Sequence, residues 1–198
     1  MRVIVLASSN QHKVKEIAAM LPSGIALKTM SEAGFTDLIE ETAETIKGNS
    51  LIKAVALRDF LRSRNDQSWV IADDSGLEVK ALNGAPGVRS ARYAAAHATD
   101  ADNVKKLLGE MQQQTERRAR FVTIITLLSE DMPFFFEGEI TGSIAHEPRG
   151  TNGFGYDPVF IPTGYRSTFA ELSANEKNAI SHRALAVDKL AKHLRAIL

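Results

Sequence analysis

The sequence predicts an α/β fold in which a mixed β-sheet is flanked by helices. Three observations predict it: strand and helix patterns alternate early in the chain, several segments carry apolar residues at helical spacing, and two long apolar segments flank a short turn. The alternation favours parallel strands and the turn favours a hairpin. No repeat or clear linker divides the 198 residues, so we expect a single domain, as one body or two closely packed lobes.

The first third of the chain predicts two strands and two helices. Residues 2–7 are β-branched and apolar, and after a polar break residues 13–21 place apolar side chains at helical spacing. A glycine- and proline-containing connection follows, in which 25–28 is a second possible strand. Residues 45–64 alternate apolar and basic faces with helical periodicity, which predicts an amphipathic helix.

The middle of the chain predicts a strand, an acidic turn and a capped helix. Residues 69–72 are typical of a short buried strand that runs into a turn at 73–76, and extended structure can resume at 77–79. A Gly/Pro loop at 83–87 follows. Residues 99–111 form a helix pattern that begins at Thr or Asp, both good N-caps.

The last third predicts a hairpin and a closing helix. Residues 120–128 and 134–145 are long apolar segments on either side of a turn at Glu130–Pro133, and such adjacent strands pair antiparallel. The remaining elements are, in order, a loop with three glycines, a short strand and a helix, at 149–157, 158–161 and 181–198.

The composition excludes several classes of site. There are no cysteines, which excludes disulfides, zinc–thiolate sites and cysteine nucleophiles and fits a reducing cytoplasm. Lys+Arg and Asp+Glu are balanced at 24 each, so we expect no nucleic acid polymer as partner, and any phosphate must be held locally. No apolar stretch is long enough to span a bilayer and no targeting segment is visible, so we expect no membrane partner and a cytoplasmic location.

A polar turn between the first strand and the first helix is a candidate phosphate site. Backbone N–H groups at a helix N-terminus favour anions, and a lysine there adds charge. The alternative is an ordinary Asn-rich turn with a surface lysine, and no P-loop pattern occurs in the chain. The turn consists of Ser8, Ser9, Asn10, Gln11, His12 and Lys13.

Two pairs of carboxylates are candidate Mg²⁺ ligands. Mg²⁺ prefers a few carboxylates together with water and substrate phosphate oxygens. Glu40-Glu41 lies in a connection, where a solvated loop is the alternative. Asp73-Asp74 follows a buried strand, where α/β proteins bind ligands, although a structural turn or helix cap would also explain it. Because side chains alternate along extended chain, only one of the two can face the ligand, and we select Asp74.

Two further segments are candidates for base recognition. In Gly153–Pro158, Phe154 lies between glycines, where an exposed aromatic ring can stack on a base and Asp157 can accept from a ring N–H. A bend packed into the core is the alternative. Glu176-Lys177 and Ser181-His182-Arg183 offer three donors near the start of the last helix, or are solvated surface residues.

Taken together, the segments resemble the inosine-triphosphatase-like family of noncanonical purine nucleoside triphosphate pyrophosphatases. The resemblance covers nearly the whole chain, with the motifs in the same order, and such a collinear set is specific. The matching motifs are Ser8-x-Asn10-x-x-Lys13, Glu40-Glu41-Thr42, Asn49 to Lys53-Ala54, Ala72-Asp73-Asp74-Ser75-Gly76-Leu77, Gly84-Ala85-Pro86-Gly87, Ser90-Ala91-Arg92-Tyr93, Gly153-Phe154-Gly155-Tyr156-Asp157-Pro158, Glu176-Lys177 and Ser181-His182-Arg183.

The resemblance implies an elongated fold of two lobes enclosing a nucleotide cleft, assembled as a homodimer. It also implies Mg²⁺-dependent hydrolysis of dITP, ITP and XTP between the α- and β-phosphates, with Asp74 as the catalytic residue and Glu41 and Asp74 as metal ligands. One position departs from the family pattern, because Gly48 stands where members often have a glutamate. The substrate-binding residues that the resemblance implies are Ser8, Ser9, Asn10, Gln11, His12, Lys13, Lys53, Ser75, Phe154, Gly155, Tyr156, Asp157, Lys177, His182 and Arg183.

Two other functions stay open from the sequence. A pyrophosphatase for pyrimidine or modified nucleotides would keep the phosphate and metal chemistry, but Phe154 and the pair His182-Arg183 favour a purine. A nucleotide- or RNA-binding module without turnover is a different class, since similar α/β folds hold nucleic acid. The balanced charge weighs against a polymer, and Asp73-Asp74 would repel phosphate unless a metal lies between them.

Overall fold

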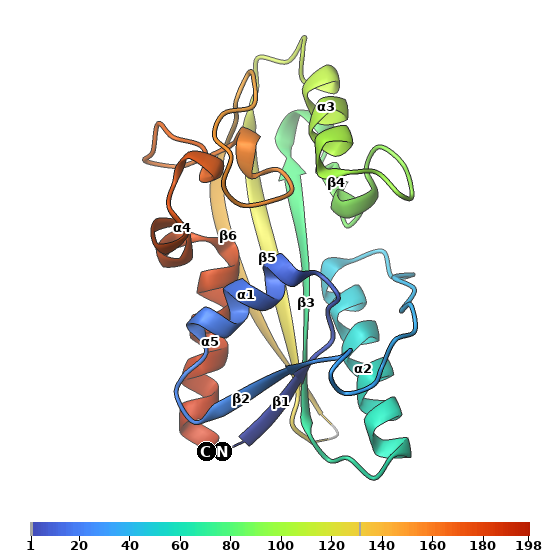
Figure 1. Cartoon of the computed structure of the whole chain (residues 1–198). Coiled ribbons are helices and arrows are strands. Elements are labelled where there is room, and N and C mark those ends of the chain that lie inside the picture. The colour runs from blue at the N-terminus through green and yellow to red at the C-terminus, as the bar shows by residue number, and fades with distance from the viewer. Residues whose placement is uncertain (1, 131) are drawn as a thin grey trace. The chain divides into compact units, whose positions relative to one another are not determined.

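A computed structural model describes residues 2–130 and 132–198. Within them, hydrogen-bonded strands form a mixed sheet in the order β2-β1-β3-β5-β6-β7, with β4 paired to β3 (Figure 1). β1 pairs parallel with β2 and β3, whereas β3–β4 and β6–β7 are antiparallel. The predicted mixed sheet with flanking helices is therefore confirmed. The strands are β1 Arg2–Leu6, β2 Ile25–Thr29, β3 Trp69–Val79, β4 Pro86–Gly87, β5 Arg118–Leu128, β6 Pro133–Ile144 and β7 Phe160–Pro162.

The α-helices α1 to α4 begin at polar N-cap residues. Asn10 caps α1 by accepting from the backbone N–H groups of His12 and Lys13, so this helix begins two residues before the predicted start. Thr45 and Thr99 cap α2 and α3, as expected from their place before an apolar pattern. The helices are α1 Gln11–Met20, α2 Ile46–Ser63, α3 Asp100–Glu110, α4 Ala174–Ile180 and α5 His182–Ile197. None of the helices in the described residues is long and apolar enough to cross a bilayer.

The turn predicted at 73–76 is wrong, because β3 runs unbroken from Trp69 to Val79. Adjacent aspartates usually interrupt a strand, since a buried carboxylate without partners is costly. Here both side chains are buried and both find cationic partners: Asp73 pairs with Arg183, and Asp74 with Lys53. Compensated charge allows the strand to continue.

Two predictions near the end of the chain also need correction. The single helix predicted at 181–198 is preceded by a separate short helix, α4, which starts at a Ser173 capping box. Ser181 has extended backbone angles and separates α4 from α5. The strand predicted at 158–161 begins later, because Asp157–Val159 form a 3₁₀ turn before β7.

β5 and β6 are the predicted hairpin. They are neighbours in the sheet and four residues apart in the sequence, a link that permits only antiparallel pairing. Of the predicted turn Glu130–Pro133, Asp131 lies outside the described residues. β5 begins two residues before its predicted start, and β6 begins one residue early and ends one residue before its predicted end.

By its internal contacts the chain divides into two compact units, each built from more than one stretch. Unit 1 comprises residues 1–74, 123–138 and 183–198, and unit 2 comprises residues 75–122 and 139–182. The strands β3, β5 and β6 each contribute residues to both units. The two units are described one at a time below.

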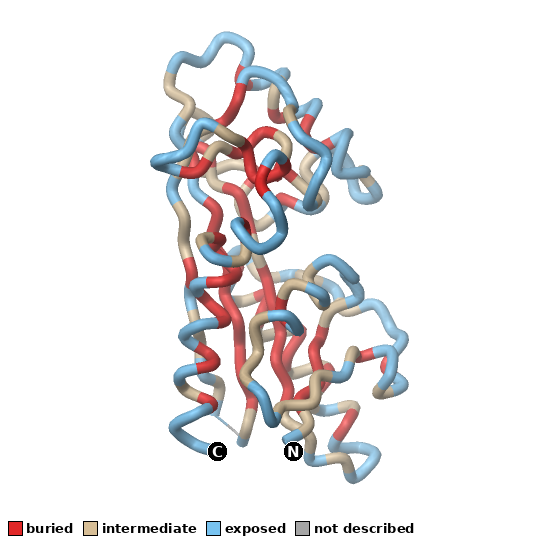
Figure 2. The backbone as a smooth tube through the Cα atoms, turned by 60° about the vertical axis from the view of Figure 1, so that its left-hand side comes forward, coloured by how far each residue is buried: buried red, intermediate tan, exposed pale blue. Residues whose placement is uncertain are grey.

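In unit 1 the strands are buried on both faces. Ile4 and Ile71 pack with α1 and α5, whereas their neighbours Val5 and Val70 pack with α2. This is the alternation expected of extended chain. Figure 1 shows α1 and α5 on one side of these strands and α2 on the other, and Figure 2 shows burial following the strands while the outer turns of the helices are exposed.

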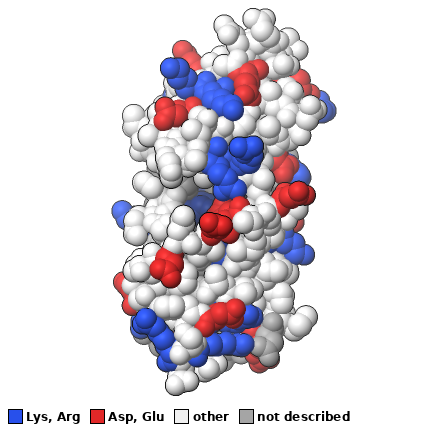
Figure 3. All heavy atoms as spheres, turned by 90° about the vertical axis from the view of Figure 1, so that its right-hand side faces the viewer, with Lys and Arg blue, Asp and Glu red and all other residues white. Residues whose placement is uncertain are grey.

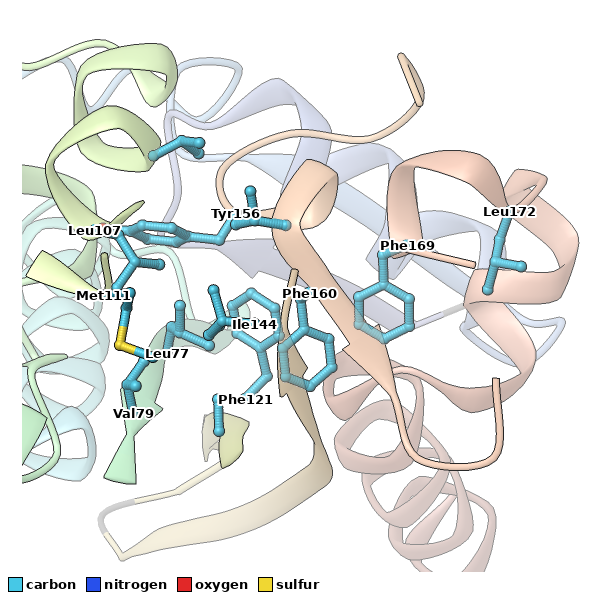
Figure 4. Packing of buried hydrophobic residues seen from close by; sticks show 13 residues of the cluster. Leu77, Val79, Leu107, Met111, Phe121, Ile144, Tyr156, Phe160, Phe169 and Leu172 are labelled. Atoms are coloured by element: carbon cyan, nitrogen blue, oxygen red, sulfur yellow. The ribbon is translucent and has the colours of Figure 1, made fainter. Parts of the chain in front are cut away.

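Unit 2 has its own aromatic core. Phe121, Phe160 and Phe169 pack together, with ring centroids 4.7 to 6.2 Å apart, and Leu107 and Met111 join them from α3 and its end (Figure 4). Buried aromatic side chains of this size contribute much of the stability of a small core.

Candidate functional site

Asp74, Lys53 and Glu41 form the first group of candidate residues in unit 1. The Lys53 ammonium lies 2.9 Å from Asp74 Oδ1 and 2.8 Å from Glu41 Oε1. Lys53 comes from α2, Asp74 from the α2-facing side of β3, and Glu41 from the connection before α2. The structure thus brings together the two predicted metal ligands and one predicted phosphate-binding lysine.

The electrostatics of this group leave Asp74 short of partners. Its Oδ2 atom is buried and has no hydrogen-bond partner among the described residues. Burial raises the pKa of Asp74 above its usual value, and Lys53 offsets this only in part. For Lys53, burial is opposed by the charges of Asp74 and Glu41, which together raise the pKa of the ammonium. Two carboxylates, those of Glu41 and Asp74, contact the one ammonium of Lys53.

The group fits a divalent cation. Among residues 2–130 and 132–198, no three His, Asp or Glu side chains gather as a complete metal cage. Mg²⁺ does not need one, because it usually binds one or two carboxylates plus waters and substrate phosphates. Such an ion requires an oxygen like Asp74 Oδ2, which has no hydrogen-bond partner in the part of the chain that the structure describes, with a second carboxylate, Glu41, in the same group. Glu41 and Asp74 are the residues that would hold it.

A second buried ion cluster lies on the opposite side of β3. The Lys13 ammonium contacts Asp73 Oδ1, and Arg183 Nε donates to Asp73 Oδ2 over 3.0 Å. Arg183 Nη1 also donates to Glu16 of α1. Burial alone raises the pKa of Asp73, but the charges of Arg183 and Lys13 outweigh it and hold the pKa far below its usual range. The two cations and two anions of this cluster balance.

The turn before α1 is built as an N-cap. Asn10 Oδ1 accepts from the N–H groups of His12 and Lys13, at 2.9 and 3.2 Å, and Ser8 Oγ accepts from the Asn10 N–H. Ser9, Gln11 and His12 are exposed. Of the six predicted phosphate-binding residues of this turn, Lys13 points into a charge cluster, at Asp73.

Two buried hydroxyls link α2 to the strands at this site. Ser50 Oγ donates to the Ala72 carbonyl over 3.1 Å and is hydrogen-bonded to Thr126 Oγ1 at 2.8 Å. Ser50 lies three residues before Lys53, and Ala72 two residues before Asp74. The sequence analysis missed this pair, and the only signal was a serine on the apolar side of an amphipathic helix.

In unit 2, Phe154, Asp157 and Lys177 form a compact group. The Lys177 ammonium lies 2.6 Å from Asp157 Oδ2 and 4.8 Å from the centre of the Phe154 ring. Asp157 Oδ2 also accepts from the Phe154 N–H at 2.8 Å. Gly153 has a positive φ of 76°, and a Cβ there would collide with the Asp157 carboxylate, so the glycine is required. Asp157 and Lys177 are buried, whereas Phe154 is half-buried.

The other predicted residues of unit 2 lie in or beside its core. Tyr156 is buried and its hydroxyl donates to the Ser90 carbonyl at 2.9 Å, while Gly155 N–H donates to Asp100. His182 is buried and stacks on Phe121 with ring centroids 4.5 Å apart. Ser75 follows Asp74 on β3 and is half-buried. The roles assigned to these residues in substrate binding stay predictions.

These observations agree with comparisons to known proteins. A family model described as the Ham1 family matches residues 4–193, which is nearly the whole chain.

The chain belongs to the Ham1 family.

Relatives match this chain over nearly their full length. The dITP/XTP pyrophosphatase of Porphyromonas gingivalis is 46% identical over 98% of both chains, and that of Clostridium perfringens is 43% identical over 100% of both. The solved structure of the Staphylococcus aureus Ham1 protein superposes with a TM-score of 0.88 at 40% identity, covering 100% of both chains. The family resemblance inferred from the motifs is confirmed by these matches.

Proposed function

We propose that this chain hydrolyses noncanonical purine nucleoside triphosphates such as dITP, ITP and XTP to the nucleoside monophosphate and pyrophosphate. The relatives from Porphyromonas gingivalis and Clostridium perfringens, both named dITP/XTP pyrophosphatase, support this activity. The observation that carries the chemistry is the buried Asp74 carboxylate, which is bound at Oδ1 by Lys53 and has no partner at Oδ2 among the residues that the structure describes. Removing such nucleotides keeps them out of DNA and RNA.

Asp74 is the residue that activates water in this proposal. Its raised pKa makes it a stronger base than an exposed carboxylate, and Oδ2 is the atom available to accept a proton. Water adds to the α-phosphorus, the bond from that phosphorus to the bridging oxygen breaks, and pyrophosphate leaves. The proton of the water passes to Asp74. No covalent intermediate is needed.

Positively charged residues hold the phosphates. Lys53, whose pKa is raised, offsets negative charge beside Asp74, and Lys13 lies beside Asp73 at the start of α1. Burial lowers the pKa of Lys13, against the charge of Asp73. Positioning and charge neutralisation supply most of the catalysis in phosphoryl chemistry. A Mg²⁺ ion held by Glu41 and Asp74 would add Lewis-acid stabilisation of the phosphate oxygens.

The base end is assigned to the group around Phe154. Its half-buried ring offers a surface for stacking, and Lys177 and Asp157 offer a donor and an acceptor beside it. A donor directed at a 6-keto oxygen favours hypoxanthine and xanthine over adenine, whose 6-amino group would leave that donor unpaired. His182 and Arg183 belong to the same proposed assignment. Guanine shares the 6-keto oxygen and differs from hypoxanthine by a 2-amino group, so its exclusion depends on an unfavourable environment at C2.

A binding module without turnover is the second candidate, and charge argues against a polymer partner. On the face shown in Figure 3, Lys and Arg side chains lie interspersed with Asp and Glu among the described residues. Polymer binding depends on a continuous basic surface.

We propose a small nucleotide as ligand, a homodimer as the assembly and the cytoplasm as the location.

One assay tests the proposed function. Pyrophosphate release is measured from ITP, XTP, dITP, GTP and ATP, each with Mg²⁺ and with EDTA. We expect release from the first three with Mg²⁺ and little from GTP or ATP. A flat profile would leave a general triphosphatase, and no release from any substrate would leave a binding module.

A further inference from the structure

The connection that carries Glu41 lies across the first turn of α2. The Ala43 N–H donates to Asn49 Oδ1 over 2.9 Å, and Asn49 is fully buried. Thr45 then caps the helix by accepting from the Gly48 N–H at 3.0 Å. The segment 41–45, which we call the Glu41 strap, is thus fastened to α2 at two points just after Glu41.

Gly48 is the residue that allows this contact. A Cβ built at Gly48 would lie 2.6 Å from the Ala43 Cβ, closer than real side chains approach, and 3.0 Å from Thr45 Oγ1, which is a tight contact. Gly48 is helical and has no positive φ, so backbone freedom does not explain the glycine. Glycine inside a helix lowers stability relative to alanine, and a close approach of another segment is an ordinary reason to keep it.

The strap and the ion pair use the same face of α2. Asn49 and Lys53 are four residues apart, so they lie one above the other on the helix. Asn49 holds Ala43, and Lys53 holds the Glu41 carboxylate at 2.8 Å. The distance between the Glu41 strap and the first turn of α2 therefore determines where the Glu41 carboxylate contacts Lys53.

We propose that Gly48 and Ala43 are positioning residues for Glu41. The space left by the missing Cβ of Gly48 is filled by the Ala43 methyl group, and this contact places the Glu41 carboxylate beside Lys53 and Asp74. The kinetic part of this proposal rests on the proposed function, whereas the geometric part does not. The two residues form a matched pair, so a change in one can be compensated by a change in the other.

The experiment is a double-mutant cycle on the full chain. It compares the wild type with Gly48→Ala, Ala43→Gly and the double variant Ala43→Gly/Gly48→Ala. Crystal structures give the distance from Lys53 Nζ to Glu41 Oε1. Kinetics with ITP give kcat, KM and the Mg²⁺ concentration at half-maximal rate. Urea unfolding shows that each variant is folded.

Gly109→Ala is the matched control. Gly109 is also a helical glycine, in α3, but a Cβ there has nothing within 4 Å. This variant adds the same methyl group to a helix without pushing on a neighbour. We expect the Glu41–Lys53 distance and kcat of the control to match the wild type.

For Gly48→Ala we expect the Glu41–Lys53 contact to open and kcat to fall by about tenfold or more, since displacements of about 1 Å cost up to ~10²-fold. The Mg²⁺ concentration at half-maximal rate should rise, while KM for ITP changes less than kcat. The double variant should regain the contact and match Ala43→Gly alone. An unchanged contact and kcat in Gly48→Ala, or no recovery in the double variant, would overturn the proposal. If the wild type releases no pyrophosphate, the proposed function fails, and the crystal distances still decide the positioning.

Discussion

Asp73 and Asp74 are neighbours in the sequence, yet they serve two ion clusters on opposite sides of β3. Asp73 faces α1 and α5 and binds Lys13 and Arg183, whereas Asp74 faces α2 and binds Lys53. Both oxygens of Asp73 contact cations, whereas Asp74 Oδ2 has no hydrogen-bond partner among residues 2–130 and 132–198. The two aspartates should therefore respond differently to the same substitution.

Asp74→Asn should remove turnover and keep binding. The amide has nearly the same shape but cannot accept the proton of the attacking water, so we expect kcat with ITP to fall by about 10²- to 10⁴-fold, the usual contribution of a general base. Binding of ITP, measured by calorimetry with Ca²⁺ in place of Mg²⁺, should change by only a few-fold. Near-normal pyrophosphate release by this variant would remove Asp74 from the mechanism.

Asp73→Asn should act on stability. The substitution leaves Lys13 and Arg183 buried with one carboxylate fewer, and breaking a buried ion pair costs about 3–5 kcal/mol. The measurement is the free energy of unfolding in urea at pH 7, with EDTA present. If Asp73→Asn unfolds at the same urea concentration as the wild type, the cluster does not contribute to stability.

The pH dependence of stability should also depend on Asp73. The pKa of Asp73 is lower in the folded protein than in the unfolded chain, despite its burial, because of Arg183 and Lys13. Its contribution is therefore fully present above the unfolded value of about 4 and is lost as the pH falls below it. Between pH 5 and pH 2.5 the wild type should lose more stability than Asp73→Asn. Parallel curves for the two proteins would contradict this assignment.

Phe154→Ala should weaken base binding alone. Stacking of a base on an aromatic ring contributes about 1–3 kcal/mol, so KM for ITP should rise by about tenfold while kcat stays within a few-fold. Inhibition by tripolyphosphate, which has no base, serves as the internal comparison and should not change. If the variant loses affinity for ITP and for tripolyphosphate by the same factor, Phe154 stabilises the fold of unit 2 and does not bind the base.

Arg183→Ala tests the assignment of Arg183 to purine binding. The family resemblance suggests this assignment, but in the structure Arg183 pairs with two carboxylates of the protein. We predict a rise in KM for ITP that is far larger than any effect on tripolyphosphate binding. Arg183 also binds Asp73 and Glu16, so the variant should lose stability as well, by about 3–5 kcal/mol. Kinetics are measured at a temperature at which thermal unfolding curves show that the variant is folded. Equal losses with ITP, GTP and ATP would assign Arg183 to phosphate.

The sequence was sufficient for the fold class and most helices because periodicity and caps are local signals. Thr45 and Thr99 begin the helices that their patterns predict. β3 was misjudged at Asp73 and Asp74 because their cationic partners, Lys13, Lys53 and Arg183, are distant in the sequence. Local propensity predicts an acidic turn at these two residues, but long-range ion pairs stabilise them within a continuous strand.

The candidate site shows the same division. The carboxylates and lysines in the sequence predicted a phosphate and metal site, and the structure brings Glu41, Lys53 and Asp74 together. Spacing could not predict that Tyr156 would reach the Ser90 carbonyl, or that Ser50 would join α2 to Ala72. These contacts join segments that no periodic pattern relates.

The last helix has a consequence for how the protein is made. Unit 1 contains both ends of the chain, and α5 packs Val187, Leu190 and Leu194 against Ile4 and Leu6 of the first strand. Because α5 is synthesised after all of unit 2, the part of the apolar surface of β1 that α5 covers stays open until then, although α1 and α2 cover other parts earlier. Partners so distant in sequence close late, which leaves that strand exposed to aggregation or chaperones during translation. A premature stop before α5 should therefore yield insoluble chain, even though the truncated product retains every other element.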